Sequence, residues 1–447
     1  MSFLRSIFYK LKFRPGAFQS GNLTPFKFRF ISADPAPYSL TSRVFCFHLF
    51  KFLAFFTIFL TSFGVPPSQA AVVTTPITIM LPKLSPACQT AINERVVEFE
   101  KKNASLKVDV LFQGSRHSTE FLLKKAESDE KLPDLSVIEL AQLSLVREKI
   151  SLPPLEFKKM QRLVRGMKPF LIHQSRDTAE QFHSLPFLRF APVLVVNEAL
   201  LEQSGWKGPL PQRWHRFEQL LKLIHQKTHQ PPLAWSLMGP TGFWLIEAWS
   251  GSALWNGKGD PHPVTLSRLR QLQDLIYTQK WAHGGLKEEE SFDQFQKKKA
   301  ALWITSSDEL AQKASELPFP WQVGLMPTLN SQEPAMNFEL QWLIHEPSKE
   351  IWQLLQFLYQ NNQAQHWIQA CGSYPLKKDW KRQDALNESV KKYWHVLKKS
   401  GSHKTRPNGS EILAWRKLWI QALEALFEQE DKSADLIETL QLIRQSH

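Results

Sequence analysis

The sequence HSLPFLRFAPVLVVNEALLEQSGW, residues 183–206, decides how the chain is organised. Its apolar run PVLVVN has the length and β-branched content of a buried strand, and it ends at Asn197. Helical periodicity follows Asn197, and a proline-containing segment with the single charge of Arg189 precedes the run. We therefore predict an extended approach, a buried strand and then a helix, with a basic residue where they join.

Strand and helix patterns alternate upstream of this stretch. Apolar or alternating runs typical of strands occur at 77–82, 107–114 and 133–140, and amphipathic helical patterns follow each of them. Strands and helices that alternate at this spacing favour a parallel sheet with crossover helices. The sequence thus predicts a first α/β lobe before residue 183.

Downstream, the chain becomes rich in helices but contains no flexible linker. Two lobes would therefore be joined by short extended segments rather than by a tether. Helical patterns are expected at 213–228, 349–370, 410–429 and 434–445 and within 243–313, and strand patterns at 300–306, 321–329 and 337–346.

The N-terminal segment has the pattern of a secretory signal. Arg43 and Lys51 precede or flank the apolar run 52–64, and small residues follow as far as Ala70. We predict export to the periplasm with cleavage near Ala70/Ala71, and an uncut signal anchor is the alternative. Because the first 70 residues hold eight basic residues and one acidic residue, their removal lowers the formal net charge from +13 to +6.

Composition and motifs exclude several function classes. The longest basic run, Lys297–Lys299, indicates a solvated helix face rather than a nucleic-acid surface. The sequence lacks a Cys/His cluster at metal-ligand spacing, and it lacks phosphate-loop, dinucleotide-binding and serine-hydrolase motifs. We therefore predict no metal and no cofactor. After cleavage only Cys88 and Cys371 remain, and the sequence leaves open whether they form a disulfide.

The order of these segments resembles family 1 of the extracellular solute-binding proteins of ABC importers, over nearly the whole chain from Ile77. The stretch 183–206 resembles the lobe-crossing signature of the family, and PQRWHRFEQLLKLI resembles its helix entry. A strand and helix of the family resemble FDQFQKKKAALWITSSDELAQ, and its returning strand resembles VGLMPTL. Its cleft loop resembles HWIQACGSYPLKKD. Within the family the binders of glycerol 3-phosphate look most similar. The chain departs from the pattern where glycines are replaced by lysines before 300–306 and by Asp308 after it.

The resemblance implies a periplasmic-binding-protein-like α/β fold, with two lobes, a ligand cleft between them and several hinge crossings. PVLVVN would then carry the chain from the first lobe to the second. The expected divisions are 1–70 for the extension and signal, 71–190 and 311–362 for the first lobe, and 191–310 and 363–447 for the second.

The implied function is capture of a small polar solute, a sugar, a polyol or a glycerol-phosphate-like molecule, by a monomeric protein that delivers it to an ABC permease. Trp244 would stack on the ligand, Glu139 would accept hydroxyl bonds, and Arg406 would hold an anionic group. Two alternatives remain: an exported hydrolase of sugars that pairs Glu139 with Glu247 or Asp308, and a binding protein that serves as a sensor or scaffold. The predicted ligand-binding residues are Arg116, His117, Glu139, Arg189, Trp244, Ser306, Ser307, Tyr374 and Arg406.

Overall fold

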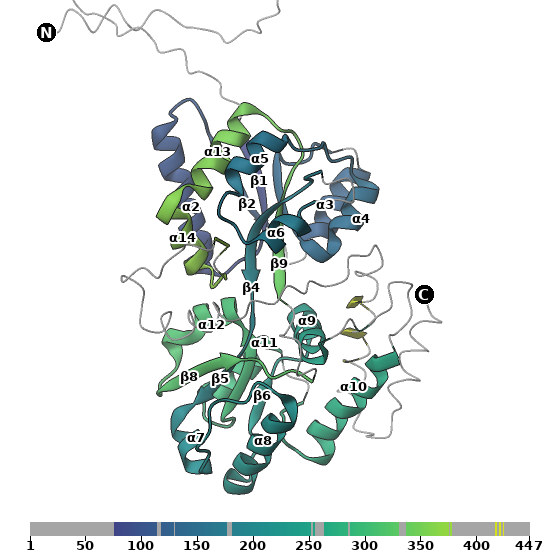
Figure 1. The fold of residues 1–447 in the computed structure, drawn as a ribbon, viewed down its shortest axis with the longest axis vertical. Helices are drawn as coiled ribbons and strands as arrows, with labels where there is room; N and C mark the ends of the chain where they lie inside the picture. The colour runs from purple at the N-terminus through teal and green to yellow at the C-terminus, as the bar shows by residue number, and fades with distance from the viewer. Residues whose placement is uncertain are drawn as a thin grey trace, which may run out of the picture. The chain divides into compact units, whose positions relative to one another are not determined.

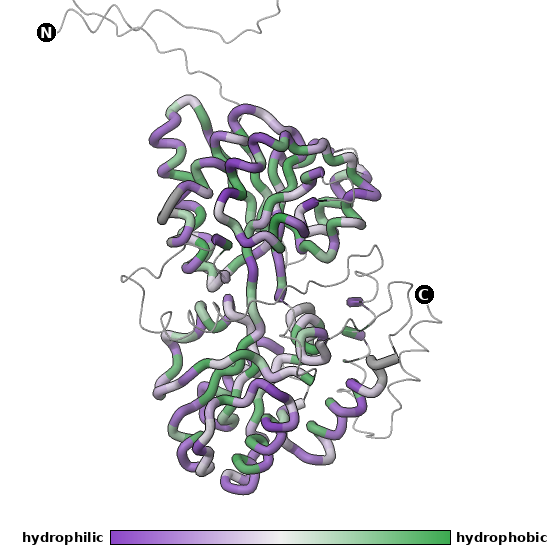
Figure 2. The backbone as a smooth tube through the Cα atoms, in the orientation of Figure 1, coloured by the Kyte–Doolittle hydropathy of each residue, from purple (hydrophilic) through white to green (hydrophobic). Residues whose placement is uncertain are grey.

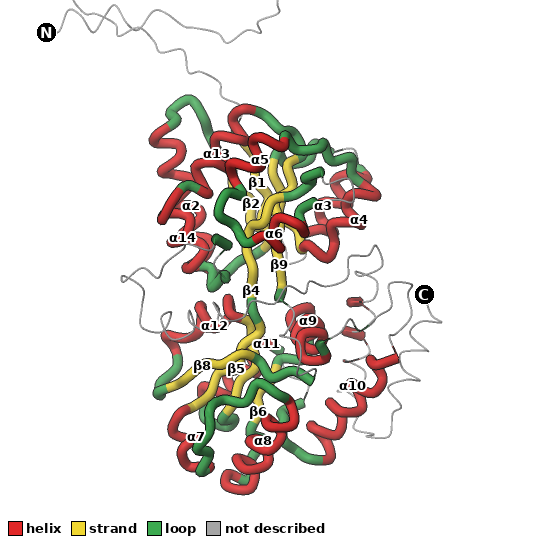
Figure 3. The backbone as a smooth tube through the Cα atoms, viewed as in Figure 1, coloured by secondary structure: helices red, strands yellow, loops and turns green. Residues whose placement is uncertain are grey.

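The computed structural model describes residues 76–113, 118–128, 130–176, 181–251, 254, 263–284, 287–329, 337–374, 376–377, 416–417, 420–421 and 423. Within them the chain forms two β-sheets, each with helices packed around it (Figure 1, Figure 3). The expected signal segment and its cleavage position lie outside the described residues. None of the described helices combines the length and hydropathy needed to span a bilayer.

The first sheet has the strand order β2-β1-β3-β9-β4. β1 pairs in parallel with both β2 and β3, as the alternation of strand and helix patterns predicts, and β9 runs antiparallel to β3 and β4. The strands are β1 (Ile77–Pro82), β2 (Val108–Gln113), β3 (Leu135–Glu139), β4 (Leu185–Phe190) and β9 (Phe338–Ile344).

The second sheet has the order β6-β7-β5-β8. β5 lies inside it, pairs antiparallel with β7 and β8 and is buried at every position, which agrees with the apolar residues 192–196. The strands are β5 (Pro192–Asn197), β6 (Leu233–Trp235), β7 (Leu302–Ser306) and β8 (Trp321–Leu325).

Helices connect the strands and cover the sheets. Those of the first part of the chain are α2 (Pro86–Lys102), α3 (Ser118–Glu127), η3 (Leu140–Gln142), α4 (Leu143–Lys149), α5 (Phe157–Leu163) and α6 (Pro169–Gln174). Those that follow β5 are α7 (Glu198–Ser204), α8 (Trp214–Thr228), α9 (Gly239–Ser250), α10 (Pro263–Gln273), η4 (Asp274–Thr278), α11 (Glu288–Gln296), α12 (Ser307–Lys313) and η5 (Ala314–Glu316). α13 (Lys349–Tyr359) and α14 (Asn361–Ala370) follow β9.

The stretch 183–206 carries the chain from one sheet to the other. β4 belongs to the first sheet, β5 belongs to the second, and Ala191 alone separates them. The extended approach is therefore itself a strand, which the sequence reading did not predict. The helix after β5 begins where expected, because the Asn197 side chain accepts a hydrogen bond from the backbone N–H of Leu200, and it ends at Gly205 in the left-handed conformation.

Two predicted lobe divisions differ from the strand pairing. The return to the first lobe was expected at residue 311, but β8 still pairs with β5, so the return lies between Leu325 and Phe338. The segment from 363 was assigned to the second lobe, but α14 packs against α2 of the first. The predicted helices 410–429 and 434–445 lie outside the described residues, apart from the helical positions 416–417, 420–421 and 423.

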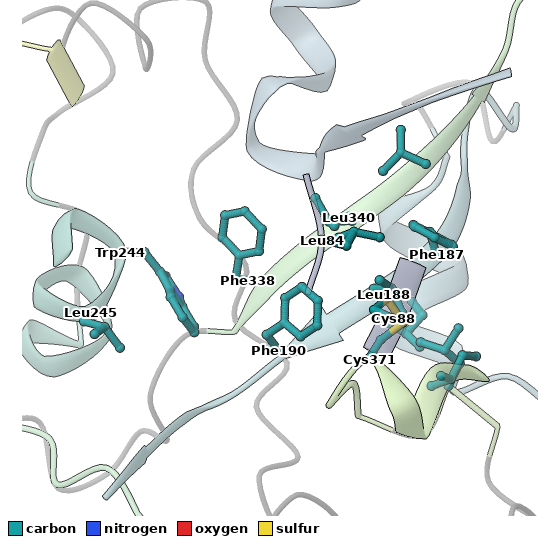
Figure 4. Close-up of a cluster of buried hydrophobic side chains, with 14 of the residues drawn as sticks. Leu84, Cys88, Phe187, Leu188, Phe190, Trp244, Leu245, Phe338, Leu340 and Cys371 are labelled. Atoms are coloured by element: carbon teal, nitrogen blue, oxygen red, sulfur yellow. A yellow bond between two sulfur atoms is a disulfide. The ribbon is translucent and has the colours of Figure 1, made fainter. Parts of the chain in front are cut away.

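Cys88 and Cys371 form a disulfide across a sequence separation of 283 residues. Cys88 lies in the first turn of α2, and Cys371 follows the last residue of α14. Both side chains are buried beside Phe187 and Leu188 of β4 (Figure 4). The bond therefore joins the end of α14 to the start of α2. It answers whether the two cysteines pair, which the sequence left open.

The core follows the strands. Apolar colour is concentrated along the two sheets, and the outer faces of the helices are largely hydrophilic (Figure 2). Among the described residues, six tryptophan side chains have less than 2% of their surface exposed, so these rings serve packing.

Candidate functional site

The carboxyl ends of the parallel strands of the first sheet define the candidate site. β1, β2 and β3 run in the same direction and end at Pro82, Gln113 and Glu139. β9 runs the opposite way, so its first residue, Phe338, lies at the same edge, two residues beyond the partner of Glu139. Open α/β sheets bind ligands at the carboxyl ends of their strands.

Glu139 is held by a buried ion pair. Nη2 of Arg416 lies 2.7 Å from Oε2 of Glu139, and only 4% and 1% of the two side chains are exposed. The Arg416 guanidinium carbon also lies 5.8 Å from the centroid of the Phe243 ring, within the range of a cation–π interaction. Arg416 therefore connects the end of β3 to α9.

Three buried aromatic rings, from α9, β9 and β4, pack together near the start of β9. The Trp244 ring of α9 lies 5.6 Å from that of Phe338, and Phe338 stacks on Phe190 at 6.2 Å (Figure 4). Trp244 is fully buried. Because the indole is fully buried, a solute can stack on this tryptophan only if neighbouring side chains move away from it.

A second ion pair lies on the opposite face of β9, since side chains alternate along a strand. Glu339 stands opposite Arg189 in register, and Nε of Arg189 lies 2.8 Å from Oε1 of Glu339. Burial lowers the pKa of Arg189 and raises that of Glu339, and each charge opposes the shift in its partner. The pair thus places two opposite charges, with no net charge, at the seam, which is the passage from β4 to β5 around Ala191.

Tyr374 shares this face with Arg189. The Arg189 guanidinium carbon lies 4.3 Å from the ring centroid of Phe170 and 5.5 Å from that of Tyr374. Lys168 Nζ donates a hydrogen bond to the Tyr374 hydroxyl. Burial raises the pKa of the Tyr374 phenol, and the positive charge of Arg189 works against that rise. The phenol is thus kept protonated at neutral pH.

Ser307 ties the segments that pass between the sheets. Its backbone N–H donates to Ala191 O at 2.8 Å, and its Oγ accepts from Ala191 N at 3.1 Å and donates to Gly372 O at 2.7 Å. Two residues beyond Gly372, the Tyr374 N–H donates to Arg189 O at 2.7 Å. These bonds align the first residue of α12 with the β4–β5 passage and with the segment after the disulfide.

Six of the nine predicted site residues lie in the described part of the chain, and each is at most 1% exposed. Glu139 and Trp244 lie near each other through Arg416 and α9, whereas Arg189, Tyr374 and Ser307 meet around the passage between the sheets. Ser306 instead caps α12, because its side chain accepts from the Glu309 N–H. The other three, Arg116, His117 and Arg406, lie outside the described residues.

Sequence reasoning missed four residues that build these contacts. Glu339 gave a usable signal, because a carboxylate inside an apolar strand needs a partner. Arg416, Phe243 and Lys168 gave none, since their neighbours come from segments far away in the sequence. The Glu139 partner, Arg416, lies ten residues beyond Arg406, the arginine predicted for the site.

Other chemistry finds little support at this edge. Among the described residues there is no group of three or more His, Cys, Asp or Glu side chains able to hold a metal ion. Glu247, a carboxylate of the alternative hydrolase hypothesis, is fully buried on α9. The arrangement offers polar groups and aromatic faces, which suits binding of a solute.

No protein-family model and no curated protein matches this sequence. The fold nevertheless matches solved structures over most of the chain. A maltose-bound protein from T. maritima has a TM-score of 0.69 and 17% sequence identity, covering 83% of this chain and 100% of that one.

Two further structures match to a similar degree. A protein from Mycobacterium tuberculosis in complex with glycerophosphocholine has a TM-score of 0.65 and 16% identity, covering 83% of this chain and 97% of its own. The maltose-maltodextrin binding protein of Alicyclobacillus acidocaldarius has a TM-score of 0.64 and 15% identity, with 83% and 100% covered. The chain therefore has the periplasmic-binding-protein-like fold that the order of its segments predicts.

Proposed function

We propose that this protein is the solute-binding component of an ABC importer. It captures a small polar solute at the seam between the two sheets and delivers it to a membrane permease, without chemical conversion. The observation that carries the proposal is the edge of the first sheet, where the Glu139–Arg416 ion pair lies beside the aromatic contact of Trp244 with Phe338. Fixed polar groups next to flat apolar faces are what a sugar or polyol requires.

The similar folds support this class of function. One of these proteins is bound to maltose and another to glycerophosphocholine, so neutral sugars and glycerol-phosphate-like solutes are the first candidates here. Export is part of the proposal: a periplasmic protein after cleavage near Ala70, acting as a monomer. The Cys88–Cys371 disulfide supports it, because disulfides persist in oxidising compartments.

The predicted ligand contacts divide by what they touch. Glu139 and Trp244 carry the proposed binding role, whereas Ser306 and Ser307 already bond to backbone and would act by positioning α12. Arg189 and Tyr374 would act at the seam. Arg116, His117 and Arg406 remain predicted ligand contacts.

A thermal-shift screen tests the proposal. The mature chain is titrated with maltose, maltotriose, glycerol, glycerol 3-phosphate and glycerophosphocholine, and a solute at 100 times its dissociation constant should add about 2.7 kcal/mol of stability. The products are then analysed for cleavage. A stabilising solute that is recovered unchanged supports capture, whereas cleavage of a glycoside favours the hydrolase, and the absence of any shift contradicts the proposal.

A further inference from the structure

Asn337 is a buried amide at the edge that forms the candidate site. The residue immediately precedes β9 and is 2% exposed. Both polar atoms of its side chain, Oδ1 and Nδ2, are buried and have no hydrogen-bond partner within the described part of the chain. Buried polar groups are nearly always hydrogen-bonded, because an unpaired one costs stability. An amide left in this state at a candidate site therefore points to a ligand.

Asn337 adjoins residues of that site along the chain, and strand alternation would set its side chain on the face of Glu339 rather than on that of Phe338. The next residue, Phe338, lies beside Trp244 (Figure 4). Glu339 pairs with Arg189. Two residues further, the register sets Leu340 opposite Glu139. Asn337 therefore lies one residue beyond the aromatic contact, at the end of the strand that joins both ion pairs.

The charges at this edge favour an uncharged ligand. Glu139 is neutralised by Arg416, and Glu339 is neutralised by Arg189, each within a buried pair. An anionic solute would have to break one of these pairs to gain a cation, and breaking a buried pair is strongly unfavourable. A hydroxyl group needs no such exchange, and an amide can both donate to it and accept from it.

We propose that Asn337 is a ligand-contacting residue whose amide pairs with a hydroxyl of an uncharged solute, so that this site selects against anionic solutes. The inference rests on the proposed function and extends it, since it names a specificity-determining residue and the charge of the ligand. Because the amide has no partner among the described residues, it lowers the stability of the free protein, and the hydroxyl of the solute supplies the partner in the complex.

The test uses a matched pair of buried amides. Gln369 of α14 is also 2% exposed, and both its polar side-chain atoms lack a hydrogen-bond partner in the described part of the chain, but α14 packs on α2. Asn337→Leu and Gln369→Met each replace an amide by an apolar side chain of similar size. Both should raise the Tm by a few degrees, and only Asn337→Leu should weaken binding of maltose or maltotriose, by about tenfold or more for the lost bonds.

Calorimetric titration and thermal unfolding of the mature protein decide the outcome, with Asn337→Ala as a smaller variant in case leucine does not fit. Unchanged sugar affinity in the Asn337 variants, or a lower Tm in both of them, would overturn the inference while the proposed function stands. Tighter binding of glycerol 3-phosphate than of sugar by the wild type would overturn the charge selection. A wild type that binds no solute of the panel would overturn the proposed function itself, and the ligand role with it.

Discussion

The Cys88–Cys371 disulfide closes a loop of unusual length, and its removal is the most direct test of how the fold is held together. The bond joins residues separated by 283 positions. In the chain-entropy model the loss of stability grows with the logarithm of loop length, which gives an upper value of about 5.6 kcal/mol here at 25 °C. Measured losses are commonly smaller, about 2–4 kcal/mol, because the unfolded chain is not a random coil.

The perturbation is the double variant Cys88→Ala with Cys371→Ala. We expect it to unfold at lower urea concentration than the oxidised wild type, with a loss of about 3–5 kcal/mol. Wild type in reductant is the matched control, because it removes the bond and keeps both sulfurs. Reductant should lower the stability of the wild type to near that of the double variant and leave the variant unchanged.

The location of the bond adds a second readout. Gly372, whose carbonyl accepts from Ser307 Oγ, follows Cys371 directly, and Tyr374 bonds to Arg189. Hydrogen exchange at the Tyr374 amide should therefore speed up in the double variant more than exchange in β7. A loss of stability below about 1 kcal/mol, with exchange unchanged, would refute the reasoning that this disulfide fixes the segment that follows α14.

Three further predictions concern individual buried groups. Burial lowers the pKa of His345 to about 4, so as the pH falls the unfolded chain takes up a proton on this histidine before the folded chain does. The free energy of unfolding should therefore fall by about 3 kcal/mol between pH 6.5 and pH 4. The variant His345→Gln should flatten that part of a profile of urea midpoint against pH, and an equal slope in the variant would contradict the assignment. The variant Glu339→Gln leaves the Arg189 charge buried without its counter-charge and should lower the free energy of unfolding in urea by about 3–5 kcal/mol. The double variant Arg189→Met with Glu339→Leu should recover most of that loss. Equal losses in the two variants would refute the charge argument. Gly372→Ala should cost more stability than Gly205→Ala, because both sites have positive φ but only the first would bring Cβ within 2.6 Å of neighbouring backbone, and a similar change in Tm for the two variants would count against this.

The sequence predicted the parts of the fold that depend on local patterns. The residues 192–196 are apolar and buried within β5, which pairs with a strand on each side. Asn197 and Gly205 bound the next helix through their own conformational preferences. The sequence did not predict β4 as a strand, because Pro186 and Arg189 interrupt its apolar pattern. The proline stands at an irregularity in the pairing with β9, and the arginine is neutralised by a residue 150 positions later.

The candidate site was predictable only in part, for the same reason. Glu139 and Trp244 could be singled out from where they stand in a strand and a helix. Their partners could not, because Arg416 is 277 residues from Glu139 and Phe338 is 94 residues from Trp244 along the chain. A pattern with the period of a helix or strand carries no information about which distant residue completes a contact.

The two buried ion pairs constrain which segments meet at the seam, even though their value for stability is modest. Removing two charges from water costs about as much as their attraction returns, so hydrophobic residues of similar size would hold the strands equally well. What hydrophobic residues lack is a required partner. Arg189 must find Glu339, and Glu139 must find Arg416, or a charge stays buried and unpaired. Each pair therefore penalises a register shift of β9 and any misplacement of Arg416. The same neutral pairs leave the polar recognition of an uncharged solute to an amide, which is the role we propose for Asn337.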